Sequence, residues 1–244
     1  MKAYGITHPG AVRKENQDFL RYEVPPGREL LTAVLCDGMG GARAGSVASS
    51  LAADAFMSHA ANSLDESTTV SDARAILREA VNFANGKVYD RAFEDYDCMG
   101  MGSTMVALLA VGRQACIANV GDSRAYLLYR NGLRRVTRDH SLVEEMVAKG
   151  HLTPAEALNH PKRNIITRAI GVEASVKAEL FDVRFLEGTR LLLCSDGLTN
   201  TVSDLEIQRV LNEIEDPEAA CQTLLDLSLR NGAPDNVTVF LAQH

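Results

Sequence analysis

The sequence lacks the patterns that mark secreted, membrane-spanning and nucleic-acid-binding proteins. Its first ten residues, MKAYGITHPG, contain no apolar signal core, and no apolar run in the 244 residues approaches membrane-spanning length. The formal net charge is −7, which argues against a broad basic surface for nucleic acid. We therefore expect a cytoplasmic protein that binds neither membranes nor nucleic acid.

The cysteines and histidines form none of the common reactive or metal-binding patterns. No CxxC, HxH or HExxH pattern occurs, no cysteine begins a Cys-x5-Arg phosphatase signature, and the P-loop spacing GxxxxGK(S/T) is absent. The five cysteines are an odd, scattered set: Cys36, Cys98, Cys116, Cys194 and Cys221. A disulfide framework and a zinc knuckle are therefore not expected, and Cys116 and Cys194 are predicted to be buried within apolar runs.

What the sequence does contain is the composition of one soluble globular domain. Apolar residues make up 46% and charged residues 23%, and 244 residues can bury one sizeable core. No internal repeat, low-complexity tract or interdomain linker is visible. We predict a single domain over residues 1–244.

Strand-like and helix-like segments come in blocks rather than in strict alternation. Strand-like segments are 2–8, 18–24, 30–36, 103–111, 114–121, 123–136, 176–185, 190–195 and 236–242. Helix-like segments are 46–60, 73–93 with an amino-terminal cap at Ser71-Asp72, 141–150, 153–158, 203–214 and 217–232. Asn131-Gly132 predicts a hairpin turn, and strands joined by such turns are antiparallel. The block order therefore favours an α+β fold with antiparallel sheets covered by helices on their outer faces, not a doubly wound parallel sheet.

Several aspartates stand where an apolar strand runs into Asp-Gly, Asp-Asn or a turn. They are Asp18, Asp37, Asp122, Asp196 and Asp235. Each alone is compatible with a simple turn. Together they could converge on one side of a sandwich, where buried carboxylates repel one another unless cations neutralise them. Oxygen ligands select hard cations, so the pattern points to Mg²⁺ or Mn²⁺.

The glycines after Asp37 fit the same hypothesis. Gly38 allows a sharp turn, so that its carbonyl could face a cation held by Asp37, and Gly40 and Gly41 allow close backbone approach. A flexible turn before the following helix is the simpler alternative.

Eight short motifs occur in an order that resembles the 2C type of metal-dependent Ser/Thr protein phosphatases, in their compact bacterial branch. The resemblance covers residues 4–241. The motifs are RKENQD at 13–18, CDGMGG at 36–41, GSTMV at 102–106, NVGDSR at 119–124, RDHS at 138–141, ITRAIG at 166–171, CSDGLT at 194–199 and APDNVTVF at 233–240.

The resemblance implies a fold of two packed antiparallel sheets flanked by helix pairs, four layers in the order αββα. It also implies two tightly bound cations. Asp37 would bridge them, the Gly38 carbonyl would ligate one, and Asp196 and Asp235 would complete the other shell. Asp18 would hold a metal-bound water, and Asp122 with Asp196 would bind a third, weaker cation.

The implied reaction is hydrolysis of phosphoserine and phosphothreonine by a metal-bridging hydroxide. Arg13 matches the family's phosphate-binding arginine, whose planar fork can take two phosphate oxygens at once. Met39 stands where eukaryotic members carry a histidine proposed as general acid, which leaves the source of the leaving-group proton open.

Residues 140–168 would form a flap beside the site. The implied partners are phosphorylated proteins and an opposing Ser/Thr kinase, and we expect a monomer.

Three alternatives stay open at this point. The chain could be a phosphatase restricted to an antagonist of an anti-sigma factor, although it has no appended sensor domain. It could be an inactive homologue that binds phosphoproteins or a kinase, although Asp37, Asp196 and Asp235 are all present. A structural β-sandwich without a site would leave the aspartates unexplained.

Overall fold

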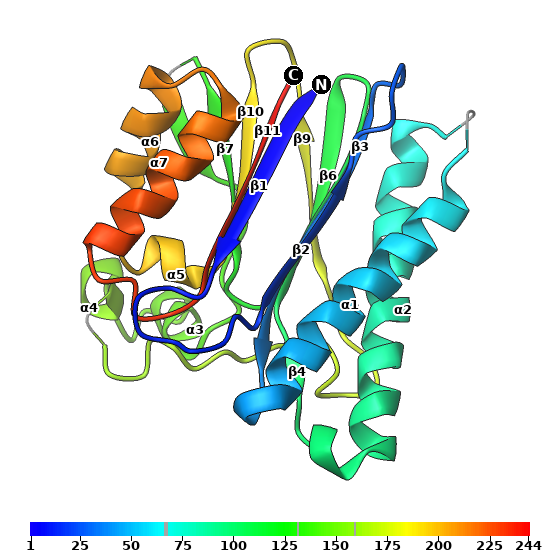
Figure 1. Cartoon of the computed structure of the whole chain (residues 1–244), viewed down its shortest axis with the longest axis vertical. Coiled ribbons are helices and arrows are strands. Elements are labelled where there is room, and N and C mark those ends of the chain that lie inside the picture. Colours follow the sequence, from blue (N-terminus) through cyan, green and yellow to red (C-terminus); the bar gives the residue numbers. More distant parts are fainter. Residues whose placement is uncertain (66–67, 131, 159) are drawn as a thin grey trace.

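The protein is built from two antiparallel sheets packed face to face, with helices on both outer faces (Figure 1). The computed structural model describes residues 1–65, 68–130, 132–158 and 160–244. Its four layers confirm the predicted α+β class and the αββα order.

The chain crosses between the two sheets, so neither sheet is continuous in sequence. The first sheet has the order β1 (Lys2–His8), β11 (Val237–Gln243), β10 (Arg190–Cys194), β7 (Arg124–Tyr129) and β8 (Gly132–Arg135). The second has the order β2 (Asp18–Glu23), β3 (Leu30–Met39), β5 (Met105–Val111), β6 (Gln114–Val120) and β9 (Glu179–Arg184), and β4 (Gly102–Ser103) pairs with the end of β3.

Strand β3 shows why its sheet is buried on both faces. Leu31, Ala33 and Leu35 join the core between the sheets, whereas Val34 and Cys36 join the core under the helices. Successive side chains of a strand point to opposite faces, so an unbroken apolar run is what a doubly covered strand requires.

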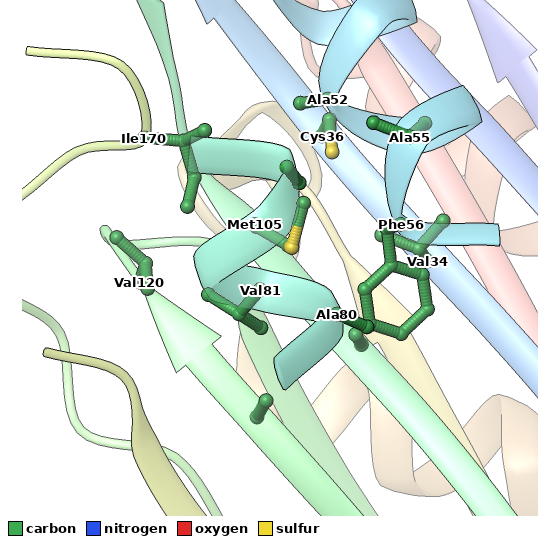
Figure 2. Packing of buried hydrophobic residues seen from close by; sticks show 14 of the residues in the cluster. Val34, Cys36, Ala52, Ala55, Phe56, Ala80, Val81, Met105, Val120 and Ile170 are labelled. Atoms are coloured by element: carbon green, nitrogen blue, oxygen red, sulfur yellow. The ribbon is translucent and has the colours of Figure 1, made fainter. Parts of the chain in front are cut away.

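Two long helices cover the second sheet. They are α1 (Gly41–Ser63) and α2 (Val70–Glu94), followed by the short 3-10 helix η1 (Tyr96–Cys98). In Figure 2, Phe56 of α1 and Val81 of α2 lie with Val34 and Met105 of the sheet in one buried cluster, which Ile170 also joins. Burial of this kind stabilises by roughly 1.5–3 kcal/mol per large side chain.

The predicted cap of α2 is wrong by two residues. The helix begins after Thr69, and the Asp72 carboxylate accepts a hydrogen bond from the Thr69 backbone N–H at 2.8 Å. Thr69 is therefore the capping residue. Asp72 is the third residue of the helix, and its side chain bonds back to Thr69, as in a capping box.

The other helices are α6 (Asp204–Glu213) and α7 (Pro217–Arg230) on the first sheet, and the short α3 (Leu142–Ala148), α4 (Pro154–Leu158) and α5 (Asp196–Thr199). The sequence did not predict η1 and α5. All the predicted strand segments contain strands, but Asn131 of the predicted hairpin lies outside the described residues.

The five cysteines are free and buried. Among the described residues, none of the helices combines the length and apolar character needed to cross a bilayer.

Candidate active site

Strand register gathers the predicted aspartates at one end of the sandwich. In the second sheet, Asp18 at the start of β2 pairs directly with Asp37 near the end of β3. In the first sheet, Cys194 at the end of β10 is opposite both Arg124 of β7 and Val239 of β11. The segments carrying the other aspartates therefore leave or enter the sheets at this same end, which is the lower one in Figure 1, near α5. Like charges directly opposite one another destabilise a sheet, so the Asp18–Asp37 pair needs a compensating charge.

This end of the sandwich contains an open pocket of about 750 Å³. Its lining includes six of the seven predicted site residues: Arg13, Asp37, Gly38, Asp122, Asp196 and Asp235. The seventh, Asp18, does not line the pocket. It is 4% exposed and lies behind the wall that Asp37 forms.

The pocket carboxylates strongly oppose one another's ionisation. Burial raises the pKa of Asp37 well above its ordinary value, and the negative charges of Asp18, Asp196 and Asp122 raise it further. Burial and the charge of Asp196 raise the pKa of Asp122 to about 7. The pKa of Asp196 is raised by burial and then by Asp235. Such a cluster is stable in its ionised form only beside cations.

Asp18 is held in place by two hydroxyl groups. Ser195 and Thr238 donate to its Oδ2 at 2.7 and 2.6 Å, whereas its buried Oδ1 has no hydrogen-bond partner. Burial raises its pKa to about 7, although the two hydroxyl bonds act in the opposite direction. A buried oxygen without a partner costs about 1–3 kcal/mol, which makes it a candidate acceptor for an ordered ligand or water.

Two glycines after Asp37 are required by the backbone. A Cβ at Gly38 would collide with the carbonyl oxygen of Gly45, where α1 passes close to β3. Gly40 has a φ of 124°, which side-chain-bearing residues rarely adopt, and it turns the chain from β3 into α1.

Arg13 lies at the mouth of the pocket. Its Nη2 donates to Asp235 Oδ2 at 2.9 Å, and the two side chains are 57% and 39% exposed. An ion pair this exposed is worth only about 0–1 kcal/mol, so Arg13 can exchange it for a ligand at little cost.

Asn236 fixes the loop that carries Arg13. Its Nδ2 donates to the carbonyl oxygens of Pro9 and Glu15, each at 2.9 Å, and its Oδ1 accepts from the Gln17 N–H at 2.8 Å. The loop is therefore tied to the segment that carries Asp235 on both sides of Arg13.

Thr104 and Asn236 line the pocket and were not predicted as site residues, although both stand in the quoted motifs. Thr104 Oγ1 accepts a hydrogen bond from the Asp37 N–H at 3.0 Å and bonds the Ser123 hydroxyl at 2.8 Å. It thereby connects Asp37 to the turn that carries Asp122. The available signal was the place of Asn236 directly after Asp235 and of Thr104 within the GSTMV motif.

The segment predicted as a flap borders the pocket through Asn164 and Ile166. Its two ends are joined by a bridge between Ser141 and Ile166 and by a hydrogen bond from Leu142 N–H to the Ile165 carbonyl at 2.8 Å. Helices α3 and α4 lie between these ends.

The donor set fits hard divalent cations. Carboxylate oxygens converge at one pocket, with an unpartnered carboxylate oxygen behind it. Within the described residues, no three or more His, Cys, Asp or Glu side chains form a group already arranged to hold a metal ion. Mg²⁺ does not require such a group, because it keeps several water ligands and binds through few carboxylates.

An acidic, open pocket with one arginine at its mouth is suited to hydrolysis of phosphate esters, with cations and a cationic side chain facing the phosphate. Fold and pocket together define the class of metal-dependent phosphatases.

The chain matches the protein phosphatase 2C family over residues 11–230, and it belongs to that family. It is 37% identical over 247 residues to the serine/threonine phosphatase Stp of Listeria welshimeri, a match that covers 100% of this chain and 96% of that one. Among solved structures, Stp1 from Staphylococcus aureus has a TM-score of 0.92 and 38% identity, covering 100% of this chain and 94% of that one. The PstP catalytic domain in complex with two manganese ions has a TM-score of 0.85 and 36% identity, covering 99% of this chain and 97% of that one.

Proposed function

We propose that this protein hydrolyses phosphoserine and phosphothreonine on other proteins, using Mn²⁺ or Mg²⁺, and that it opposes a Ser/Thr protein kinase. The observation that carries the proposal is the convergence of aspartates from both sheets on one pocket with Arg13 at its mouth. The similarity to serine/threonine phosphatases over the whole chain supports the substrate class.

Asp37, the Gly38 carbonyl, Asp196 and Asp235 would hold two cations, and Asp122 with Asp196 would hold a third, weaker one. PstP, which was solved with two manganese ions, supports the first pair. Divalent cations in such a site lower the pKa of water and neutralise charge on the phosphoryl oxygens. Asp18 lies behind Asp37, where it would orient a water ligand.

The chain's own residues would bind and orient the phosphate ester. Arg13 would leave Asp235 and take two phosphate oxygens in a bidentate contact. Asn236 would keep the loop of Arg13 at a fixed distance from the carboxylates. Met39 lines the pocket but has no proton to give, and no histidine lines it among the described residues. We infer that the proton for the leaving alkoxide comes from water.

An inactive homologue is the alternative, and it would be expected to lack one of these carboxylates. All of them are present, and four line the pocket. We further propose that residues 1–244 form one catalytic domain that acts as a monomer in the cytoplasm. The five free cysteines are compatible with that reducing compartment.

The test is an assay on an aryl phosphate and a phosphothreonine peptide, with chelated protein and after addition of Mn²⁺ or Mg²⁺. We expect both activities to vanish on chelation and to return with either cation. Full turnover by a sample verified as metal-free would refute the proposal.

A further inference from the structure

A second pocket of about 570 Å³ adjoins the active site. Met39 and Ile166 line both pockets, so together they form the shared wall. We call the second one the flanking pocket. Its other apolar side chains are those of Ala169, Val172 and Val176, and Arg168 forms part of its wall.

The flanking pocket has one exposed apolar side chain, Val172, beside three half-buried ones, Met39, Ile166 and Val176. Val172 is 56% exposed although it is a large apolar side chain. It packs against Gly102 in β4, and a side chain at position 102 would collide with it. Partly exposed apolar side chains grouped in a concave site, rather than scattered singly, mark a binding surface.

The backbone of the flanking pocket is pinned to the body of the protein. Ile170 and Ser103 exchange two backbone hydrogen bonds, at 2.7 and 3.0 Å. The buried Asn85 of α2 accepts from the Gly171 N–H at 2.8 Å and donates to the Glu173 carbonyl at 3.0 Å. The Ile170 side chain also enters the helix–sheet core seen in Figure 2. This irregular segment is therefore preformed, which lowers the entropy cost of binding.

The charged groups of the flanking pocket do not define an anion site. Arg168 Nη1 donates to the Lys177 carbonyl at 2.7 Å and lies 3.1 Å from His140 Nε2, so the guanidinium braces the wall. Lys177 and Glu173 both line the pocket and carry opposite charges. Apart from the hydroxyl residues Thr167 and Ser175, the remaining lining is apolar.

We propose that the flanking pocket binds an aliphatic side chain of the phosphoprotein substrate, a few residues from the phosphorylated one. This inference rests on the proposed function, which brings a polypeptide to the adjoining pocket. The two pockets share Met39 and Ile166 as a wall, and an extended chain advances about 3.3 Å per residue, so we take positions within about three residues of the phosphorylated one as the range to test. Met39, whose flexible thioether adapts to different shapes, would contact both parts of the substrate.

The experiment uses the whole chain with Mn²⁺ and phosphothreonine peptides in a serine background. A single leucine is placed in turn at each position within about three residues of the phosphothreonine. We expect leucine at one position to raise kcat/KM about tenfold over serine, within the range for apolar groups in a pocket. In Val172→Asp the ratio of kcat/KM for the leucine peptide to that for the serine peptide should fall to about one. The rate of each variant on an aryl phosphate is measured beside it as the reference for the active site itself.

Leu205→Asp is the matched control, because Leu205 is an 80% exposed aliphatic residue on α6, outside the flanking pocket. It should keep the leucine preference. A ratio near one at every position in the unaltered protein, or an equal preference in Val172→Asp, would overturn the flanking-pocket proposal while leaving the phosphatase proposal intact. In a parallel series with aspartate in place of leucine, a gain in kcat/KM for aspartate would also overturn it. Absence of hydrolysis on both the aryl phosphate and the peptides would overturn both proposals.

Discussion

Replacement of Asp18 by asparagine should stabilise the chelated protein and weaken its cation binding. Asp18 is buried, and this burial, followed by the charges of Asp196 and Asp235, raises its pKa to about 7. Asparagine keeps the shape and can accept the bonds from Ser195 and Thr238 through its own oxygen, but it carries no charge. The substitution therefore removes one of the opposing charges while the local hydrogen bonds persist.

The magnitude follows from the change in pKa. A carboxyl whose folded-state pKa rises from 3.8 to about 7 loses at most about 4 kcal/mol of folding free energy on ionisation, since a tenfold change in proton affinity is about 1.4 kcal/mol. Because the folded-state pKa is the higher one, folding favours the protonated carboxyl. The contribution of protonated Asp18 to the free energy of unfolding is complete below about pH 4 and is lost as the pH rises through about 7. Chelated wild-type protein should thus become less stable between about pH 5 and pH 7.5, and Mn²⁺ should reduce that loss.

The assay is urea unfolding followed by circular dichroism at about pH 5 and pH 7.5, with chelator and with Mn²⁺. At the higher pH with chelator, Asp18→Asn should exceed wild type by roughly 1–4 kcal/mol, and calorimetry should show weaker Mn²⁺ binding. Asp90→Asn, at an exposed position on α2, controls for a general charge effect. Equal stability changes in the two variants would refute the reasoning that ionisation of the buried Asp18 costs folding free energy.

Substitutions at four further positions test the rest of the site. Asp37→Ala and Asp235→Ala should each abolish turnover and weaken Mn²⁺ binding, and unchanged calorimetric titrations of both would show that the cations bind elsewhere. Arg13→Ala should reduce kcat/KM by the equivalent of roughly 1.5–3 kcal/mol, mainly through KM, and Arg13→Lys should recover only part because it lacks the bidentate fork; unaltered kinetics would assign Arg13 to the surface. Asp122→Ala should slow hydrolysis of a phosphothreonine peptide more than of an aryl phosphate, since a poor leaving group depends most on a proton and Met39 cannot supply one; equal losses would exclude the Asp122 site as its source.

The fold was predictable because its strands and helices are specified locally. The β3 run is apolar without interruption because both faces are covered, and the 30–36 prediction falls inside the observed strand. The cap of α2 was misplaced because Thr69, Ser71 and Asp72 are all capping residue types, and only the structure shows which one lies at the cap. Helix α5 is a single short turn after Ser195, too brief for a periodic pattern to reveal.

The site was predictable only in part, because its supporting contacts join residues far apart in the chain. The aspartates stand in recognisable motifs, so six of the seven predicted positions line one pocket. The hydroxyls that hold Asp18 lie 177 and 220 positions away, and the Asp18–Asp37 pairing depends on strand register that no short pattern encodes. The pKa of Asp18 shows why these unpredicted contacts matter. Burial and the charges of Asp196 and Asp235 raise it, whereas the Ser195 and Thr238 hydroxyls lower it, so those two residues favour the ionised carboxylate that cation binding requires.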